Sequence, residues 1–123
     1  MSASRVLVTV RGHILHMELN RAEKRNAADV SMLQELALAY GELDRNPELR
    51  VGVVSGVGEH FTGGLDLADV AAHLKAEGLW YVPEGGLDPW GVQSKSVSKP
   101  VIVAVNGTCF TLGIELILAA DIA

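Results

Sequence analysis

Two stretches of alternating apolar and polar residues open the chain, between Arg5 and Leu19, with a break at Gly12. A period of two places successive side chains on opposite faces of an extended backbone. The alternating apolar residues are Val6, Val8 and Val10 before the break, and Leu15, Met17 and Leu19 after it. This pattern predicts a β-hairpin with one apolar face.

A helical period follows between Asp29 and Leu43. The apolar residues that recur there at helical spacing are Val30, Leu33, Ala37 and Tyr40. Asn46-Pro47 predicts the end of this helix, because proline cannot continue the hydrogen-bond ladder. Residues 51–55 are short, β-branched and bounded by glycine, which predicts a buried strand.

The second half of the chain repeats the order of strand and helix. A glycine-bearing loop at 56–64 is followed by an apolar set at the spacing of a short amphipathic helix, namely Leu67, Val70, Ala71 and Leu74. Residues 77–98 contain both tryptophans and show no period, which predicts a long loop with a few helical turns that serves as a functional segment or lid. A buried strand at 101–105 and an apolar helix at 112–120 complete the alternation typical of an α/β fold.

Composition narrows the class of protein. The 123 residues are 49% hydrophobic and 20% charged, which is ordinary for a soluble globular core. A formal charge of −5 argues against a nucleic-acid partner held by bulk electrostatics. No export signal or membrane-spanning run is visible. The single cysteine, Cys109, favours a reducing cytoplasm, and no histidine has the spacing of a metal ligand, so we expect no metal.

Two turns between strand and helix, 61–66 and 106–115, contain the candidate chemistry. Each places backbone N–H groups at the start of a helix, where they have no intrahelical acceptor and stabilise negative charge. Glu115 shares a helix face with the Leu112 N–H. Because the neighbours of Glu115 are apolar, we expect a carboxylate within a buried helix, which is costly without a function. The alternatives are a solvated helix residue or a partner of the helix dipole, and glycine-rich turns are more often structural.

Three ordered segments resemble the enoyl-CoA hydratase (crotonase) family. They comprise residues 19–27, residues 61–67, and residues 99–107 followed by Glu115-Leu116 and 119–122. The resemblance spans nearly the whole chain. It implies an α/β, crotonase-like (ClpP/crotonase) spiral of ββα units, with residues 1–123 as the N-terminal part of a single domain that is incomplete at the C-terminus.

The same resemblance assigns roles to residues. It implies an acyl-CoA thioester whose carbonyl oxygen accepts hydrogen bonds from the backbone N–H groups of Leu65 and Leu112. Glu115 aligns with the first of two glutamates that activate water in family hydratases, and the second lies downstream in the family. The residues implied to line the substrate and its CoA, mostly through main-chain contacts, are Glu23, Lys24, Arg25, Gly64, Leu65, Asp66, Leu67, Ala68 and Leu112.

The implied reaction is hydration of a 2-enoyl-CoA in fatty acid metabolism, by a lyase that needs no cofactor apart from the CoA thioester that is its substrate. A homotrimer or dimer of trimers, with no nucleic-acid or membrane partner, is implied as well. Isomerisation, decarboxylation and thioester hydrolysis use the same oxyanion hole and stay open, as does a chain that binds acyl-CoA or a partner subunit without catalysis. We expect residues 1–123 alone to be inactive, because half of the acid–base pair is missing.

Two positions depart from the family pattern. Thr111-Leu112-Gly113 stands where the family commonly has a run of glycines, which implies a tighter or reshaped pocket near the acyl α-carbon. Ala68 stands where many members have a basic residue that faces a CoA phosphate.

Overall fold

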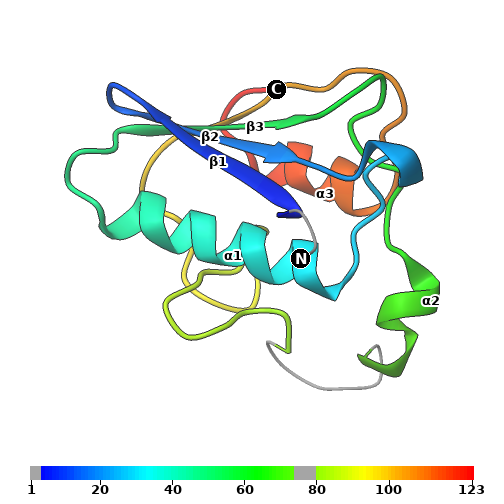
Figure 1. Cartoon of the computed structure of the whole chain (residues 1–123). Helices are drawn as coiled ribbons and strands as arrows, with labels where there is room; N and C mark the ends of the chain where they lie inside the picture. The colour runs from blue at the N-terminus through cyan, green and yellow to red at the C-terminus, as the bar shows by residue number, and fades with distance from the viewer. Residues whose placement is uncertain (1–3, 74–79) are drawn as a thin grey trace.

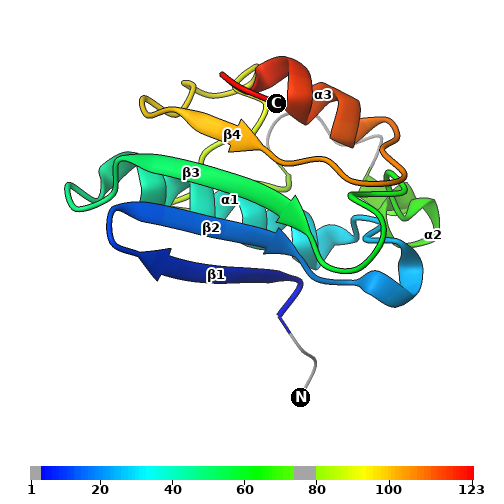
Figure 2. The same ribbon diagram turned by 90° about the horizontal axis from the view of Figure 1, so that it is seen from above.

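The structure, a computed structural model, describes residues 4–73 and 80–123. Within these ranges four strands form one sheet in the order β1-β2-β3-β4. The strands are β1 (Val6–Arg11), β2 (Ile14–Leu19), β3 (Val51–Gly56) and β4 (Val101–Val103). The first pair is antiparallel, and the other two pairs are parallel. Figure 1 shows helix α1 (Val30–Arg45) along one face of the sheet, and Figure 2 shows the four strands side by side with helix α3 (Leu112–Ala119) beyond β4.

The predicted hairpin is confirmed, with Val6 opposite Leu19 and with Gly12 at positive φ in the turn. Its apolar face is only partly covered. Val6 is buried, but Val8 and Val10 are 49% and 58% exposed. Both lie opposite buried residues of β2, so they point toward the same face. They stay exposed because β1 is the edge strand and has a neighbouring strand on one side only.

Helix α1 begins and ends close to the predicted residues. Asp29 is the N-cap, and its Oδ1 accepts a hydrogen bond of 2.9 Å from the Met32 N–H. Such a cap satisfies a donor that has no partner inside the helix. Asn46 is the C-cap. The buried side chains of α1 pack on the sheet and form the main core with residues of β2 and β3, among them Leu33, Leu36, Leu43, Met17 and Val54.

The α-helix expected to include Leu67, Val70, Ala71 and Leu74 is shorter in the structure than predicted. The chain forms α2 (Leu67–Val70) and then a 3₁₀ turn at Ala71–His73, and Leu74 lies outside the described residues. Val70 is buried, whereas Leu67 is 61% exposed. This segment packs through Val70 rather than along a whole helical face.

The described part of the predicted loop, residues 80–98, contains turns and bends instead of the expected helical turns, and residues 77–79 lie outside the description. Its centre is Asp88, which is almost fully buried. One carboxylate oxygen accepts from the Tyr81 hydroxyl at 2.9 Å and the Trp90 N–H at 3.2 Å. The other accepts from the N–H groups of Val92 at 3.1 Å and Gln93 at 3.0 Å. Hydrogen bonds to one buried charge therefore organise this loop in place of a backbone ladder.

The same loop is attached to α1 through Asp44. Its Oδ1 accepts from the backbone N–H of Ser98 at 2.7 Å and from the Ser98 hydroxyl at 2.8 Å, and its Oδ2 lies 3.2 Å from Lys95 Nζ. Hydrogen bonds to a carboxylate favour its charged form. The N–H of Ser98, then its hydroxyl and Lys95, lower the pKa of Asp44 to about 2.

We expect this attachment to weaken at low pH. A carboxylate whose pKa is lower in the folded state stabilises the fold above its unfolded pKa and loses that contribution as pH falls through the folded value. For Asp44 the loss, up to about 2 kcal/mol, should develop between about pH 4 and pH 2. Denaturant unfolding of the complete gene product from pH 7 to pH 2 measures it. Asp44→Asn should flatten the profile in this range, and Glu48→Gln, at an exposed position, should not. Equal profiles for wild type and Asp44→Asn would contradict the expectation.

The C-terminal elements follow the prediction with two corrections. Strand β4 ends at Val103, two residues before the expected end, and Val105 is exposed. Helix α3 is buried along one side only, through Leu112, Gly113 and Leu116. After it, Ile122 forms a single bridge with Ile102 of β4. None of the helices in the described ranges is long and apolar enough to cross a membrane.

Candidate active site

Main-chain pairing brings the two predicted turns together. Segment 61–66 lies between residues 25–28 and residues 106–110 and forms one bridge to each, Ala28 with Leu65 and Thr62 with Cys109. The N–H of Phe110 donates to Thr62 O at 3.1 Å. Residues far apart in the sequence thus form one continuous backbone surface.

Two buried polar side chains hold this arrangement. Asn26 accepts from the Arg21 N–H at 2.7 Å and donates to the carbonyl oxygens of Val57 and His60 at 3.0 and 2.8 Å. The Thr62 hydroxyl donates to Asn26 O at 2.8 Å and accepts from the Gly64 N–H at 3.1 Å. Neither residue was expected from the sequence to support the site. The only available signal was an asparagine in a turn, since asparagine tolerates the positive φ observed at Asn26.

The bridge to Ala28 sets the direction of the Leu65 N–H. The Ala28 N–H donates to Gly64 O and the Asp66 N–H donates to Ala28 O, both at 2.8 Å. Because these flanking groups point toward Ala28, the N–H of Leu65 points to the opposite side. It donates to no acceptor within residues 4–73 and 80–123.

Leu112 is the first residue of α3, so its N–H has no intrahelical acceptor. Across the described parts of the chain it has no other acceptor. The residue before it, Thr111, has a φ of 40°, which is unusual for a β-branched residue. The Trp90 indole N–H donates to Leu112 O at 3.2 Å and ties the loop at 80–98 to the start of α3.

Leu65, Leu112 and Glu115 line one cavity of about 290 Å³. The other lining residues are mostly apolar or aromatic: Leu33, Trp80, Tyr81, Asp88, Trp90, Val92, Gln93 and Thr111. The structure thus brings together two free N–H donors and one carboxylate. The expectation that Glu115 lies in a buried helix is wrong: Glu115 is exposed, because its side of α3 faces the cavity and solvent.

The residues expected to line CoA occupy two adjacent turns. Residues 23–25 are exposed at a 3₁₀ turn, and the Gly63 N–H donates to Arg25 O at 2.7 Å. Leu67 and Ala68 are exposed at the start of α2. The carboxylate of Asp66 accepts from Arg21 Nη1 at 2.7 Å, which lowers its pKa. The backbone of Asp66 is engaged as well, because its N–H donates to Ala28 O and its carbonyl oxygen accepts from the N–H groups of Asp69 and Val70.

The loop at 77–98 was expected from the sequence to be functional, but the side chains that form the cavity wall were not identified. Tyr81 packs edge-on against Trp80 and Trp90, with ring centroids 5.3 and 5.8 Å apart. Burial raises the pKa of the Tyr81 hydroxyl, and its hydrogen bond to Asp88 and the charges of Asp88 and Glu115 raise it further. The hydroxyl therefore stays protonated at neutral pH.

Two further reactive side chains, His60 and Cys109, lie outside the cavity lining. His60 Nδ1 accepts from the Thr108 N–H at 3.0 Å and supports the second turn. Burial raises the pKa of the Cys109 thiol, which keeps it protonated and weakly nucleophilic. Among the residues that the structure describes, no three His, Cys, Asp or Glu side chains converge as a metal site would require.

Comparisons with known proteins agree on one family. The family model described as enoyl-CoA hydratase/isomerase matches residues 9–123. A Delta(3,5)-Delta(2,4)-dienoyl-CoA isomerase, mitochondrial, from Mus musculus is 34% identical over 94% of this chain and 38% of its own length. A probable enoyl-CoA hydratase 1, peroxisomal, from Arabidopsis thaliana is 33% identical over 90% of this chain and 40% of its own length. The chain thus spans about 40% of these curated relatives.

A solved structure of a probable enoyl-CoA hydratase/isomerase from Mycobacterium abscessus superposes with a TM-score of 0.90. Its sequence is 50% identical, and the match covers 96% of this chain and 45% of the chain in that structure. An enoyl-CoA hydratase from Mycobacterium tuberculosis H37Rv, 35% identical, superposes with a TM-score of 0.79 over 98% of this chain and 45% of its own.

Proposed function

The chain belongs to the enoyl-CoA hydratase/isomerase family and has part of its crotonase-like α/β fold, and we propose that the protein it belongs to hydrates a 2-enoyl-CoA. One observation carries this proposal: the free N–H groups of Leu65 and Leu112 and the carboxylate of Glu115 belong to residues that line the same cavity. Two backbone donors and one carboxylate on residues that line one cavity suit a reaction in which a carbonyl oxygen gains charge while a proton moves.

In the proposed mechanism the thioester carbonyl oxygen accepts one hydrogen bond from each of the backbone N–H groups of Leu65 and Leu112. Attack of water at the β-carbon moves negative charge through the α-carbon onto this oxygen, and the two donors stabilise the enolate. One such donor is typically worth about 3 kcal/mol in the transition state. Because the donors are backbone groups, the side chains of Leu65 and Leu112 do not take part.

Glu115 accepts the proton that the attacking water loses. The resulting hydroxyl group remains on the β-carbon, and the enolate collapses when an acid protonates the α-carbon. By the family resemblance, that acid is a second glutamate downstream of residue 123. Asp88 is a poor substitute, because its carboxylate already accepts four hydrogen bonds from the loop.

The alternative in the same family is isomerisation, and a relative with that name is 34% identical. An oxygen-18 assay separates the reactions. The complete gene product is incubated with crotonyl-CoA or a 3-enoyl-CoA in ¹⁸O-labelled water. A hydratase forms labelled 3-hydroxyacyl-CoA, an isomerase moves the double bond without label, and a thioesterase releases CoA. Tight binding without any product would support a non-catalytic role and contradict the proposal.

Residues 1–123 produced alone serve as the negative control in this assay. We propose that they lack enzyme-like turnover, since the second acid is not among them. Robust turnover by this piece would contradict the assignment of two glutamates.

We propose in addition that the protein assembles as a homotrimer or dimer of trimers, acts in fatty acid metabolism and is cytoplasmic. Exposed apolar side chains near and on α3 need a covering surface, which either the rest of the domain or a second subunit supplies: Phe110, Ile114, Leu118 and Ile122. The single cysteine agrees with a reducing compartment. Sedimentation of the complete gene product tests the assembly, and a fluorescent fusion tests the location.

A further inference from the structure

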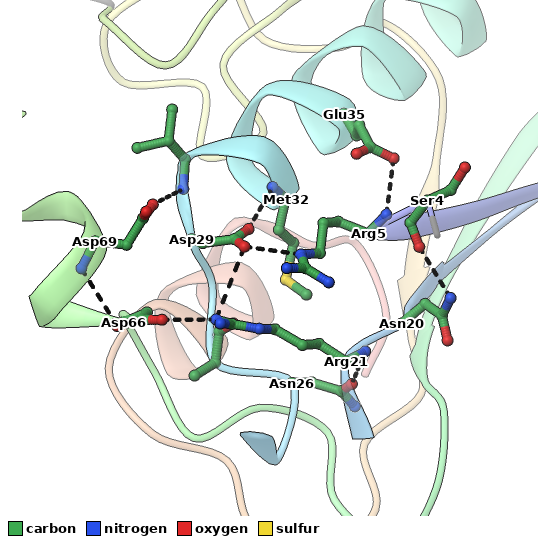
Figure 3. A network of polar contacts seen from close by, with 12 residues as sticks. Ser4, Arg5, Asn20, Arg21, Asn26, Asp29, Met32, Glu35, Asp66 and Asp69 are labelled. Carbon is green, nitrogen blue, oxygen red and sulfur yellow. Dashed lines mark hydrogen bonds and ion pairs between the residues drawn. The ribbon is translucent and has the colours of Figure 1, made fainter. Parts of the chain in front are cut away.

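Arg21 connects two segments that are distant in sequence and adjacent in space. Its Nη1 donates to Asp66 Oδ2 at 2.7 Å and to Ala27 O at 3.2 Å, and lies 3.8 Å from Asp29 Oδ2. The side chain is only 12% exposed. Figure 3 shows it extended between the two carboxylates of Asp66 and Asp29.

The two groups that Arg21 holds flank the bridge that directs the Leu65 N–H. Ala27 precedes Ala28, and Asp66 follows Leu65. A single guanidinium therefore ties both sides of the Ala28–Leu65 bridge at the residues next to it. Rotation of the 64–66 backbone, which would turn the Leu65 N–H away from its present direction, breaks the two bridge hydrogen bonds and is opposed by the Arg21–Asp66 contact.

Further contacts restrain the same segment from the other side. Asp66 Oδ1 accepts from the Asp69 N–H at 3.4 Å, and Asp69 Oδ2 accepts from the Val30 N–H at 2.8 Å. These bonds link the start of α2 to the start of α1, as Figure 3 shows. Arg21 completes a closed set of contacts around the segment that contains Leu65.

The burial of Arg21 indicates a role beyond stability. Its Nε is buried and has no hydrogen-bond partner in the described part of the chain. A buried donor without a partner is unfavourable for folding. The Arg21 guanidinium is buried despite this unfavourable free energy, and its Nη1 contacts residues on both sides of one bridge. Such an arrangement is typical of a residue that fixes the local backbone geometry.

We propose that Arg21 is a positioning residue for the oxyanion hole, which it serves by holding Asp66 and Ala27 so that the Leu65 N–H keeps its direction. The inference rests on the proposed function of that N–H. Arg21 does not line the cavity and is not expected to touch the acyl group.

The chain offers a matched control in Arg5. Its Nε donates to Asp29 Oδ2 at 2.7 Å, so it makes an ion pair of the same kind in the same network. It has no contact with the bridge between Ala28 and Leu65. Arg5→Met and Arg21→Met therefore each remove one guanidinium from the network, and only the second releases the 64–66 segment.

The test compares a thioester with its thioether. Butyryl-CoA has the carbonyl oxygen, and S-butyl-CoA has a methylene group in its place. Calorimetric Kd values for both ligands are measured on the complete gene product and its variants. The ratio of the two affinities reports the hydrogen bonds to the carbonyl oxygen, and kcat for crotonyl-CoA is measured in parallel.

We expect the wild type to prefer the thioester and Arg21→Met to lose most of that preference, with S-butyl-CoA affinity unchanged within a few-fold. Its kcat should fall about 10- to 100-fold, the scale expected for a misplaced catalytic group. Arg21→Lys keeps the positive charge but lacks the planar guanidinium, so it should be intermediate. Arg5→Met should keep both the preference and kcat.

The possible results distinguish a failure of the proposed function from a failure of the positioning role of Arg21. No thioester preference in the wild type would reject the proposed function itself. A wild-type preference that Arg21→Met retains, with unchanged kcat, would overturn the positioning role. Equal loss of affinity for both ligands, together with a lower Tm, would also overturn it in favour of a general structural role. If Arg21→Met does not fold, Asp66→Asn decides, because it removes the charge and nearly keeps the shape. A lost thioester preference with unchanged S-butyl-CoA affinity in Asp66→Asn supports the inference, and a retained preference overturns it.

Discussion

Gly64→Val is expected to abolish acyl-CoA binding, whereas Leu65→Ala should leave the affinity within a few-fold. Gly64 has a φ of 102°, a conformation that a β-branched residue strongly resists. A Cβ at this position would lie 2.7 Å from Thr111 Oγ1, so the side chain would also push the two turns apart. The Leu65 side chain can change because its backbone N–H is the proposed donor.

Calorimetry with butyryl-CoA on the complete gene product measures this difference. Gly63→Ala is the control in the same turn, because it adds a side chain at the neighbouring glycine. A Cβ at Gly63 would lie 3.6 Å from its nearest neighbours, which is an ordinary contact. Gly63→Ala should therefore bind nearly as the wild type does. If Gly64→Val and Leu65→Ala lost the same affinity, side-chain packing rather than main-chain donation would define the site.

Glu115→Gln is expected to lower kcat by about 10²- to 10⁴-fold, equivalent to roughly 3–5 kcal/mol, while Kd for butyryl-CoA stays within a few-fold. Glutamine keeps the shape of the side chain but cannot accept the proton of the attacking water. The Tm should not change, since the exposed Glu115 side chain makes no hydrogen bond or ion pair with any residue that the structure describes.

Steady-state rates per folded enzyme, Kd and Tm are compared for this variant and for Glu84→Gln. Glu84 is an exposed carboxylate on the loop that forms the cavity wall, and it does not line the cavity. Its variant should behave like the wild type. An unchanged kcat in Glu115→Gln would remove Glu115 from the mechanism and leave the oxyanion hole as the only catalytic feature. A joint fall in Tm and affinity would indicate a structural glutamate.

The sequence by itself determined the elements whose signal is local. The alternation before and after Gly12 predicted the hairpin, and the helical period after Asp29 predicted α1 together with its end near Asn46. The ordered segments identified the family, which the comparisons show. These features depend on neighbouring residues along the chain, so period and turn chemistry are sufficient to predict them.

Only the tertiary structure decided which side chains are covered and which distant groups meet. Val8 and Val10 follow the predicted period but lie on an edge strand, and Glu115 has apolar neighbours but lies on the open side of α3. Asp88 organises a loop that has no period, and Arg21 meets Asp66 across 45 positions of the chain. Burial and long-range pairing depend on what packs against a residue, and no local pattern of hydrophobic and polar positions contains that information.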